Sequence, residues 1–106
     1  METHPKKRLE IFIEAPALSR VSHILDSSGV PGYTVLPVIS GSGDSGPWTR
    51  DGLVSSAGGM VTVVCIVDED QIDKLLDKVF TVVSRQIGII NVSDCQVVRD
   101  AKFQVH

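Results

Sequence analysis

The sequence is poor in the residues from which most catalytic and metal sites are built. Its 106 residues include three histidines, and none of them stands at ligand spacing from a cysteine or another histidine. No Ser-His-Asp or Cys-His arrangement can be placed, and no glycine-rich stretch ends in the Gly-Lys-Ser/Thr of a P-loop. We therefore expect no catalytic residue and no metal ligand, and a binding protein rather than an enzyme.

Positive charge, aromatic residues and long apolar runs are scarce as well. The net charge of −3 disfavours general nucleic-acid binding, and the predicted third strand lacks the aromatic residues on which RNA-binding sheets stack bases. No apolar run is long enough to cross a bilayer, and no signal-peptide core follows Met1. Cys65 and Cys95 lie in apolar runs, as expected of buried thiols in a cytoplasmic protein. We expect one soluble domain over residues 1–106.

What the sequence does contain is a β-α-β-β-α-β pattern of apolar periodicity. Alternation of apolar and polar residues predicts strands, and apolar residues at three- and four-residue spacing predict helices. The predicted elements are, in order, a strand over Arg8–Glu14, a helix from Pro16 to Ser28, strands over Tyr33–Ser40 and Met60–Val67, a helix from Asp68 to Val83, and a strand over Gly88–Val98. This order predicts an α+β ferredoxin-like sandwich with both helices on one face of an antiparallel sheet.

Four single positions refine this prediction. Gly29 is expected to cap the first helix, and Pro37 to restrict the second strand to an edge of the sheet or to a bulge. Ser93-Asp94 suggests a bulge or kink in the last strand. Phe80 falls within the apolar stripe of the second helix and is expected in the core.

A long glycine-rich loop, Gly41–Gly59, separates the second and third predicted strands. It holds six of the nine glycines of the chain, together with Trp48 and Arg50. Small domains that keep a loop of this length usually use it for function, and an aromatic residue beside a cation favours ligand or partner contact over a passive loop. We expect the loop to be mobile without ligand and to order, at least in part, when a ligand binds.

The third predicted strand is apolar on both faces, with Val61, Val63, Cys65 and Val67 on one face and Val64 and Ile66 on the other. Such a strand must be covered on both sides. Two helices are enough for one face of the sheet, so a neighbouring subunit is the simplest cover for the other.

Three segments resemble the PII-type signal-transduction proteins. Gly29–Val35 (GVPGYTV), followed by Gly41-Ser42-Gly43, resembles the second strand and the entry to the long T-loop of that family. Val67–Asp73 (VDEDQID) is similar to its junction between the third strand and the second helix, and Gln96–Arg99 (QVVR) to the end of its last strand. The resemblance extends from Leu9 to about Lys102. It implies a homotrimer of ferredoxin-like subunits that binds adenine nucleotides between subunits and engages transporters or enzymes through the T-loop, here residues 41–59.

The resemblance also implies roles for single residues. Thr34 and Met60 would contact the adenine, whereas Gly88 and Ile89 would stand in the B-loop of the adjacent subunit. Backbone near the phosphates would come from Gly41, Ser42 and Gly43, and Arg99 would approach a phosphate before the C-terminal tail, residues 99–106. In the T-loop, Trp48 and Arg50 would be available to bicarbonate or to a partner.

Departures from the nitrogen-sensing members indicate which branch of the family is the more similar one. Ile89 stands where those members carry a phosphate-binding lysine, and Ala101 where they carry a second arginine. The chain is thus more similar to the PII-like branch associated with carboxysomes and bicarbonate transport, which implies ADP or AMP as ligand and a response to inorganic carbon. Two alternatives stay open, namely an ATP- and 2-oxoglutarate-sensing nitrogen regulator and a divalent-cation-binding ferredoxin-like trimer.

Overall fold

A computed structural model gives the fold of the chain and describes residues 1–43, 46–49, 59–86 and 88–98. The elements are β1 (His4–Glu14), the 3-10 turn η1 (Ala15–Ala17), α1 (Leu18–Ser27), β2 (Tyr33–Pro37), β3 (Ser40–Gly43), β4 (Gly46–Thr49), β5 (Met60–Val67), the 3-10 turn η2 (Glu69–Gln71), α2 (Ile72–Val83) and β6 (Gly88–Val97).

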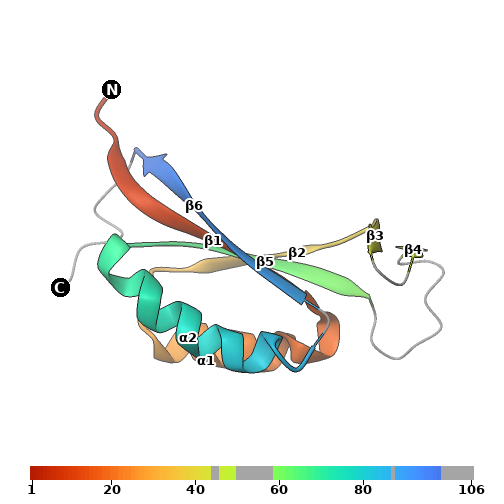
Figure 1. The fold of residues 1–106 in the computed structure, drawn as a ribbon. Coiled ribbons are helices and arrows are strands. Elements are labelled where there is room, and N and C mark those ends of the chain that lie inside the picture. The colour runs from red at the N-terminus through yellow and green to blue at the C-terminus, as the bar shows by residue number, and fades with distance from the viewer. Residues whose placement is uncertain (44–45, 50–58, 87, 99–106) are drawn as a thin grey trace.

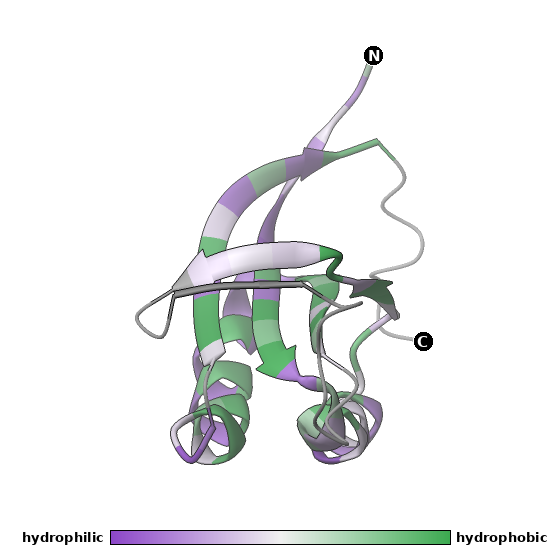
Figure 2. Ribbon diagram, turned by 90° about the vertical axis from the view of Figure 1, so that its right-hand side faces the viewer, coloured by the Kyte–Doolittle hydropathy of each residue, from purple (hydrophilic) through white to green (hydrophobic). Residues whose placement is uncertain are grey.

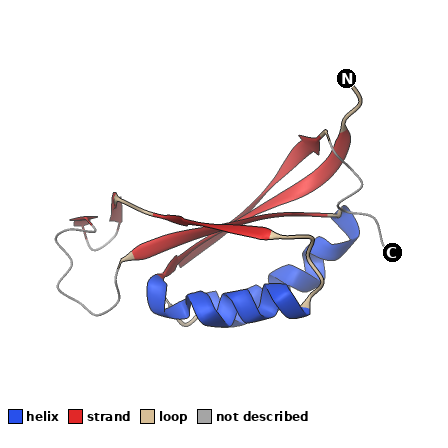
Figure 3. Cartoon of the chain, turned by 180° about the vertical axis from the view of Figure 1, so that it is seen from behind, coloured by secondary structure: helices blue, strands red, loops and turns tan. Residues whose placement is uncertain are grey.

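Four of the strands form one antiparallel sheet in the order β2-β5-β1-β6. Both helices lie side by side against one face of this sheet (Figures 1 and 3). The arrangement is the predicted α+β ferredoxin-like sandwich. A separate two-stranded sheet, β3-β4, lies beyond one end of the main sheet, next to the start of β5 (Figure 1).

Local sequence explains where the helices begin and end. Asp68 caps the η2–α2 segment in a capping box, in which its backbone N–H donates to the Gln71 side chain at 3.2 Å and its own side chain accepts from the Gln71 backbone. Beyond the end of α1, Gly29 adopts a φ of 72°, which L-residues with a side chain rarely adopt, and so terminates the helix as predicted.

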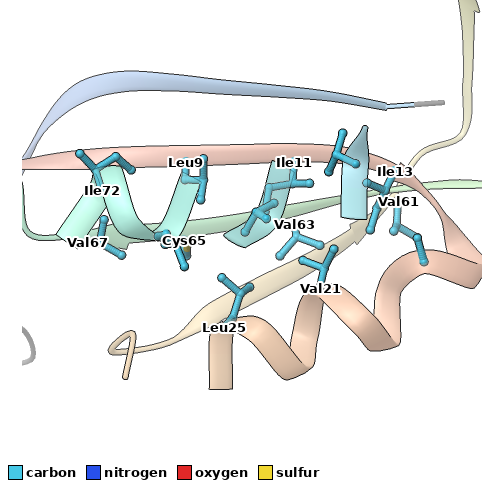
Figure 4. Packing of buried hydrophobic residues seen from close by; sticks show 14 residues of the cluster. Leu9, Ile11, Ile13, Val21, Leu25, Val61, Val63, Cys65, Val67 and Ile72 are labelled. Atoms are coloured by element: carbon cyan, nitrogen blue, oxygen red, sulfur yellow. The ribbon is translucent and has the colours of Figure 1, made fainter. Parts of the chain in front are cut away.

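The core lies between the sheet and the two helices (Figure 4). Its largest fully buried side chains come from the alternate residues of β1 and β5 and from one stripe of each helix: Leu9, Ile11, Ile13, Leu25, Val21, Val63, Val67 and Val79. Burial of each such side chain stabilises the fold by about 1.5–3 kcal/mol. Since this core holds one face of the sheet against the helices, the opposite face is left for other contacts.

The structure confirms Pro37 as a residue of an edge strand, because it is the last residue of β2. Two other predictions are wrong. The β1–β6 register runs through Ser93 and Asp94 without a bulge, and Lys7, opposite Asp94, forms an ion pair with it. Phe80 is 61% exposed, because α2 turns only Ile72, Leu75, Val79 and Val83 fully into the core.

The predicted second strand is shorter than expected, because it ends at Pro37, and the chain then forms the β3-β4 hairpin. Part of the predicted loop Gly41–Gly59 is therefore strand. The rest of the loop, residues 44–45 and 50–58, lies outside the described residues.

Candidate functional site

The face of the sheet turned away from α1 and α2 is called the open face below; Figure 2 shows both helices on the other side of the sheet. Side chains alternate along a strand, so the residues between the buried ones on β1 and β5 belong to this face. By the strand register they include Arg8, Glu10 and Phe12 on β1, Met60, Thr62, Val64 and Ile66 on β5, Thr34 and Leu36 on β2, and Ile89 and Asn91 on β6. Leu36 is 48% and Ile89 65% exposed. Within the described part of the chain, no helix covers this apolar surface.

Thr34 borders a hollow at the end of the β2–β5 pair. Thr34 lies opposite Val64, and the hollow has a volume of about 280 Å³. Its walls are Pro31, Gly32, Tyr33, Thr34, Val64, Cys65 and Ile66. Pockets for small ligands commonly have volumes of about 300–1,000 Å³. The hollow therefore has the size of a partial site, with polar and apolar wall surface in similar shares and the Thr34 hydroxyl available to orient a ligand.

Met60 lies on the same face but at the other end of the sheet. It is four residues from Val64 along β5, which corresponds to about 13 Å. Met60 is opposite Glu14, Gly88 is opposite Ile13, and Ile89 is opposite Phe12. One end of the sheet therefore holds Met60, Gly88 and Ile89. At this end β1 lies between Met60 on β5 and the two residues of β6.

The glycines of β3 belong to the same end. The backbone N–H of Val38 donates to the Met60 carbonyl at 3.1 Å, and Gly41 follows Val38 by three residues. Three residues of extended chain span at most about 11 Å, so Gly41 lies near Met60. The structure therefore divides the predicted residues into two groups, with Thr34 towards one end of the main sheet and Met60, Gly88, Ile89 and Gly41–Gly43 at or beyond the other.

Gly88 has a structural reason to be glycine. A Cβ atom at this position would lie 2.6 Å from the backbone oxygen of Phe12 and 3.1 Å from Val83 Cγ1. Contacts under 3.0 Å with backbone require the strands to move apart. The absence of a side chain at Gly88 is thus explained by packing within the subunit, whether or not a ligand approaches it.

Four of the predicted residues are only partly placed or not placed. Trp48 lies on β4 with its backbone opposite Gly41, and Ser42 is opposite Pro47. Arg50 and Arg99 lie outside the described residues. The β3-β4 hairpin itself was missed from the sequence, although Gly43-Asp44-Ser45-Gly46 is a sequence typical of a tight turn.

A second hollow, of about 240 Å³, lies where β1 begins and β6 ends, and sequence reasoning did not find it. It is lined by Pro5, Lys6, Lys7, Glu69, Asp94, Cys95 and Gln96. The hydrogen bond from Lys7 to Asp94 raises the pKa of Lys7, and Glu69 lies 3.9 Å away. Lys6 forms an ion pair with Asp68, the helix-capping residue. These lysines therefore join the sheet to α2 and to β6 and leave little positive charge for an anion.

The two cysteines are free thiols on different strands. Cys65 is buried in the core, and burial raises the pKa of its thiol to about 11. Cys95 is half-buried, and its Sγ donates to the Lys6 carbonyl at 3.6 Å. Among the described residues, no three His, Cys, Asp or Glu side chains come together as metal ligands. None of the described helices is long and apolar enough to span a bilayer.

A family profile described as "Nitrogen regulatory protein P-II" matches residues 6–102, nearly the whole chain. The chain belongs to the P-II family. The same P-II fold is found in solved structures of CPII, a nitrogen regulatory PII-like protein from Thiomonas intermedia K12. A comparison with curated proteins found no match.

Three CPII structures illustrate the likeness. The structure with ADP, AMP and bicarbonate has 28% identity and a TM-score of 0.86, over 96% of each chain. A structure with ADP and bicarbonate has 29% identity and a TM-score of 0.83, over 97% of this chain and 98% of that one. A third, with ADP, AMP and acetate, has 27% identity and a TM-score of 0.79, over the same shares. These findings confirm the predicted fold and the resemblance to PII-like proteins.

Proposed function

We propose that this P-II protein is a non-catalytic cytoplasmic regulator that binds ADP or AMP, together with bicarbonate, in the clefts between the subunits of a homotrimer. Through its T-loop, residues 41–59, it would signal to an inorganic-carbon transporter or a related partner of the carboxysome system. The observation that carries this proposal is the likeness to CPII, over 96% of both chains, in a structure that holds ADP, AMP and bicarbonate.

The open face supports the trimer. Val64 and Ile66 remain partly accessible on a strand whose other face is buried, and Leu36 on β2 and Ile89 on β6 are exposed on the same face of the sheet. Apolar side chains gathered on one exposed face commonly mark a surface that another protein or subunit covers. Closed rings of identical subunits cover such a face on every copy. Only the interior of an assembly would remove these side chains from solvent together.

The division of the candidate residues into two groups supports a ligand site between subunits. Thr34 and Met60 lie about 13 Å apart along one subunit. The hollow beside Thr34 is also small for a nucleotide. If the Thr34 end of one subunit faces the Met60 end of the next, the two partial sites combine into one cleft. The adenine would then lie in the hollow beside Thr34, Val64 and Ile66, and the phosphates would lie near the backbone of Gly41–Gly43.

The preference for ADP or AMP follows from the charge available to the phosphates. Ile89, 65% exposed at the start of β6, offers no charge where nitrogen-sensing members carry a lysine. Ala101 likewise offers none in place of their second arginine. Each charge-assisted hydrogen bond that is lost costs about 1.5–3 kcal/mol, so the third phosphate of ATP should gain little. A small anion would instead fill the space beside the shorter nucleotide.

Calorimetric titration with AMP, ADP and ATP, each with and without bicarbonate, tests the proposal. We expect ADP and AMP to bind at least as tightly as ATP, and bicarbonate to increase their affinity. Thr34→Val removes only the hydroxyl and should weaken binding of every nucleotide. Thr81→Val, on the exposed face of α2, is the matched control and should leave nucleotide affinity unchanged.

Contrary results would separate the alternatives. ATP binding tenfold tighter than ADP would favour a nitrogen-type regulator, and nucleotide affinity indifferent to bicarbonate would remove the inorganic-carbon part of the proposal. Saturable binding of a divalent cation without nucleotide would favour the cation-binding alternative. A monomeric mass in light scattering at micromolar concentration would refute the site between subunits.

A further inference from the structure

The entry of the chain into β5 is held by an unusual backbone at Gly59. This residue is buried and has a φ of 94°, a conformation that residues with a side chain rarely adopt. Among the described residues, Gly29 is the only other one with a positive φ. Gly29 terminates a helix, which explains its conformation. Gly59 follows no helix, so its conformation serves another purpose.

Two hydrogen bonds show what the Gly59 backbone holds in place. The Gly59 carbonyl accepts from the Ala15 N–H at 2.9 Å, at the point where β1 passes into the first turn before α1. The next carbonyl, that of Met60, accepts from the Val38 N–H at 3.1 Å. The chain therefore leaves the sheet after Val38 and returns to it at Gly59. The adjacent carbonyls of Gly59 and Met60 both accept backbone hydrogen bonds at this point. The turn at Gly59 lets the chain enter β5 sharply without losing either bond.

We infer that Gly59 is a positioning residue for the phosphate end of the nucleotide site, a role that rests on the proposed function. Its backbone fixes Met60 and, through the Val38 bond, the start of the segment that leads to Gly41–Gly43. An L-residue at a positive φ favours a different backbone conformation by about 1–2 kcal/mol. A side chain at this position therefore shifts the ends of the loop relative to the sheet. Gly59 itself needs no contact with the ligand to have this effect.

The pair Gly59→Ala and Gly29→Ala tests the role with matched variants. Both place a methyl group at a positive φ, and the Gly29 site has nothing within 4 Å of the added Cβ. We expect Gly59→Ala, at the buried position, to lose at least as much stability in urea titrations as Gly29→Ala, and only Gly59→Ala to lose ADP affinity, by about tenfold. Gly59→Asn should retain more affinity than Gly59→Ala, because asparagine tolerates positive φ better.

Comparison of ADP with adenosine separates positioning from general damage. If Gly59 positions the phosphate end, Gly59→Ala should weaken ADP binding by a clearly larger factor than adenosine binding, which only the shift of Met60 against the adenine would affect. An equal loss for both ligands, or an equal loss in Gly29→Ala, would overturn the inference and leave the proposed function intact. Wild-type protein that binds neither ligand would overturn the proposed function together with the inference.

Discussion

Substitution of Gly88 by alanine distinguishes a structural glycine from a ligand-binding one. The added Cβ would lie 2.6 Å from the Phe12 backbone oxygen, which cannot rotate away, and 3.1 Å from Val83 Cγ1. Relief requires β6 to move away from β1 near their closing pair, Ile13 and Gly88. Overpacking of this kind costs about 1–3 kcal/mol, and the rigid backbone oxygen favours the upper half of that range.

Urea unfolding, measured at one fixed protein concentration, is the appropriate assay because assembly also affects apparent stability. For a domain of this size, a loss of about 2 kcal/mol corresponds to a fall in Tm of roughly 10 °C. Gly32→Ala is the control, since its Cβ would have nothing within 4 Å, and it should change stability by no more than about 0.5 kcal/mol. Unchanged stability in Gly88→Ala together with weakened ADP binding would refute the packing explanation and assign Gly88 to the ligand.

Three further predictions concern other parts of the molecule. Between pH 9 and 11, the Cys65 thiol loses its proton in the unfolded chain before it does so in the folded protein. The free energy of unfolding of the wild type should therefore fall with rising pH by about 2–3 kcal/mol relative to that of Cys65→Val. The same pH dependence of unfolding in both proteins would contradict the raised pKa. Lys6→Met leaves the Asp68 carboxylate without this partner and should cost about 1–3 kcal/mol in urea unfolding, whereas Lys78→Met on the exposed face of α2 should be nearly neutral. Saturation with ADP should change the emission or anisotropy of Trp48, and no change in either would argue against ordering of residues 41–59.

Much of the fold could be predicted because apolar periodicity is set by local sequence. The apolar run Met60–Val67 predicted a strand, and β5 covers the same residues. The position of Phe80 could not be predicted in this way. A helical repeat shows that a stripe exists, but the width of the stripe that enters the core depends on how α2 lies over the sheet. The register at Asp94 is a matter of pairing with β1, whose Lys7 is 87 residues away in sequence.

The candidate site could be predicted from the sequence as a set of residues, whereas their arrangement in one subunit needed the structure. Thr34 and Met60 were both assigned to the adenine, yet the strand register separates them by about 13 Å on one subunit. Register is set by pairing between distant segments, so it cannot be read from either segment alone. The role of Gly59 could not be predicted for a similar reason, since a glycine-rich sequence does not show which glycine has a positive φ.

The order of the strands in the sheet has a consequence for how the chain folds during synthesis. β1 is the first strand made, but it lies between β5 and β6, with His4 opposite Val97. β2 pairs with β5 and not with β1. None of the four strands can therefore pair before β5 is made, and β1 gains its second neighbour only after Gly88–Val97 leaves the ribosome. Folding dominated by such distant pairings is slow, so Leu9, Ile11 and Ile13 stay exposed through most of synthesis and provide a site at which a chaperone could act.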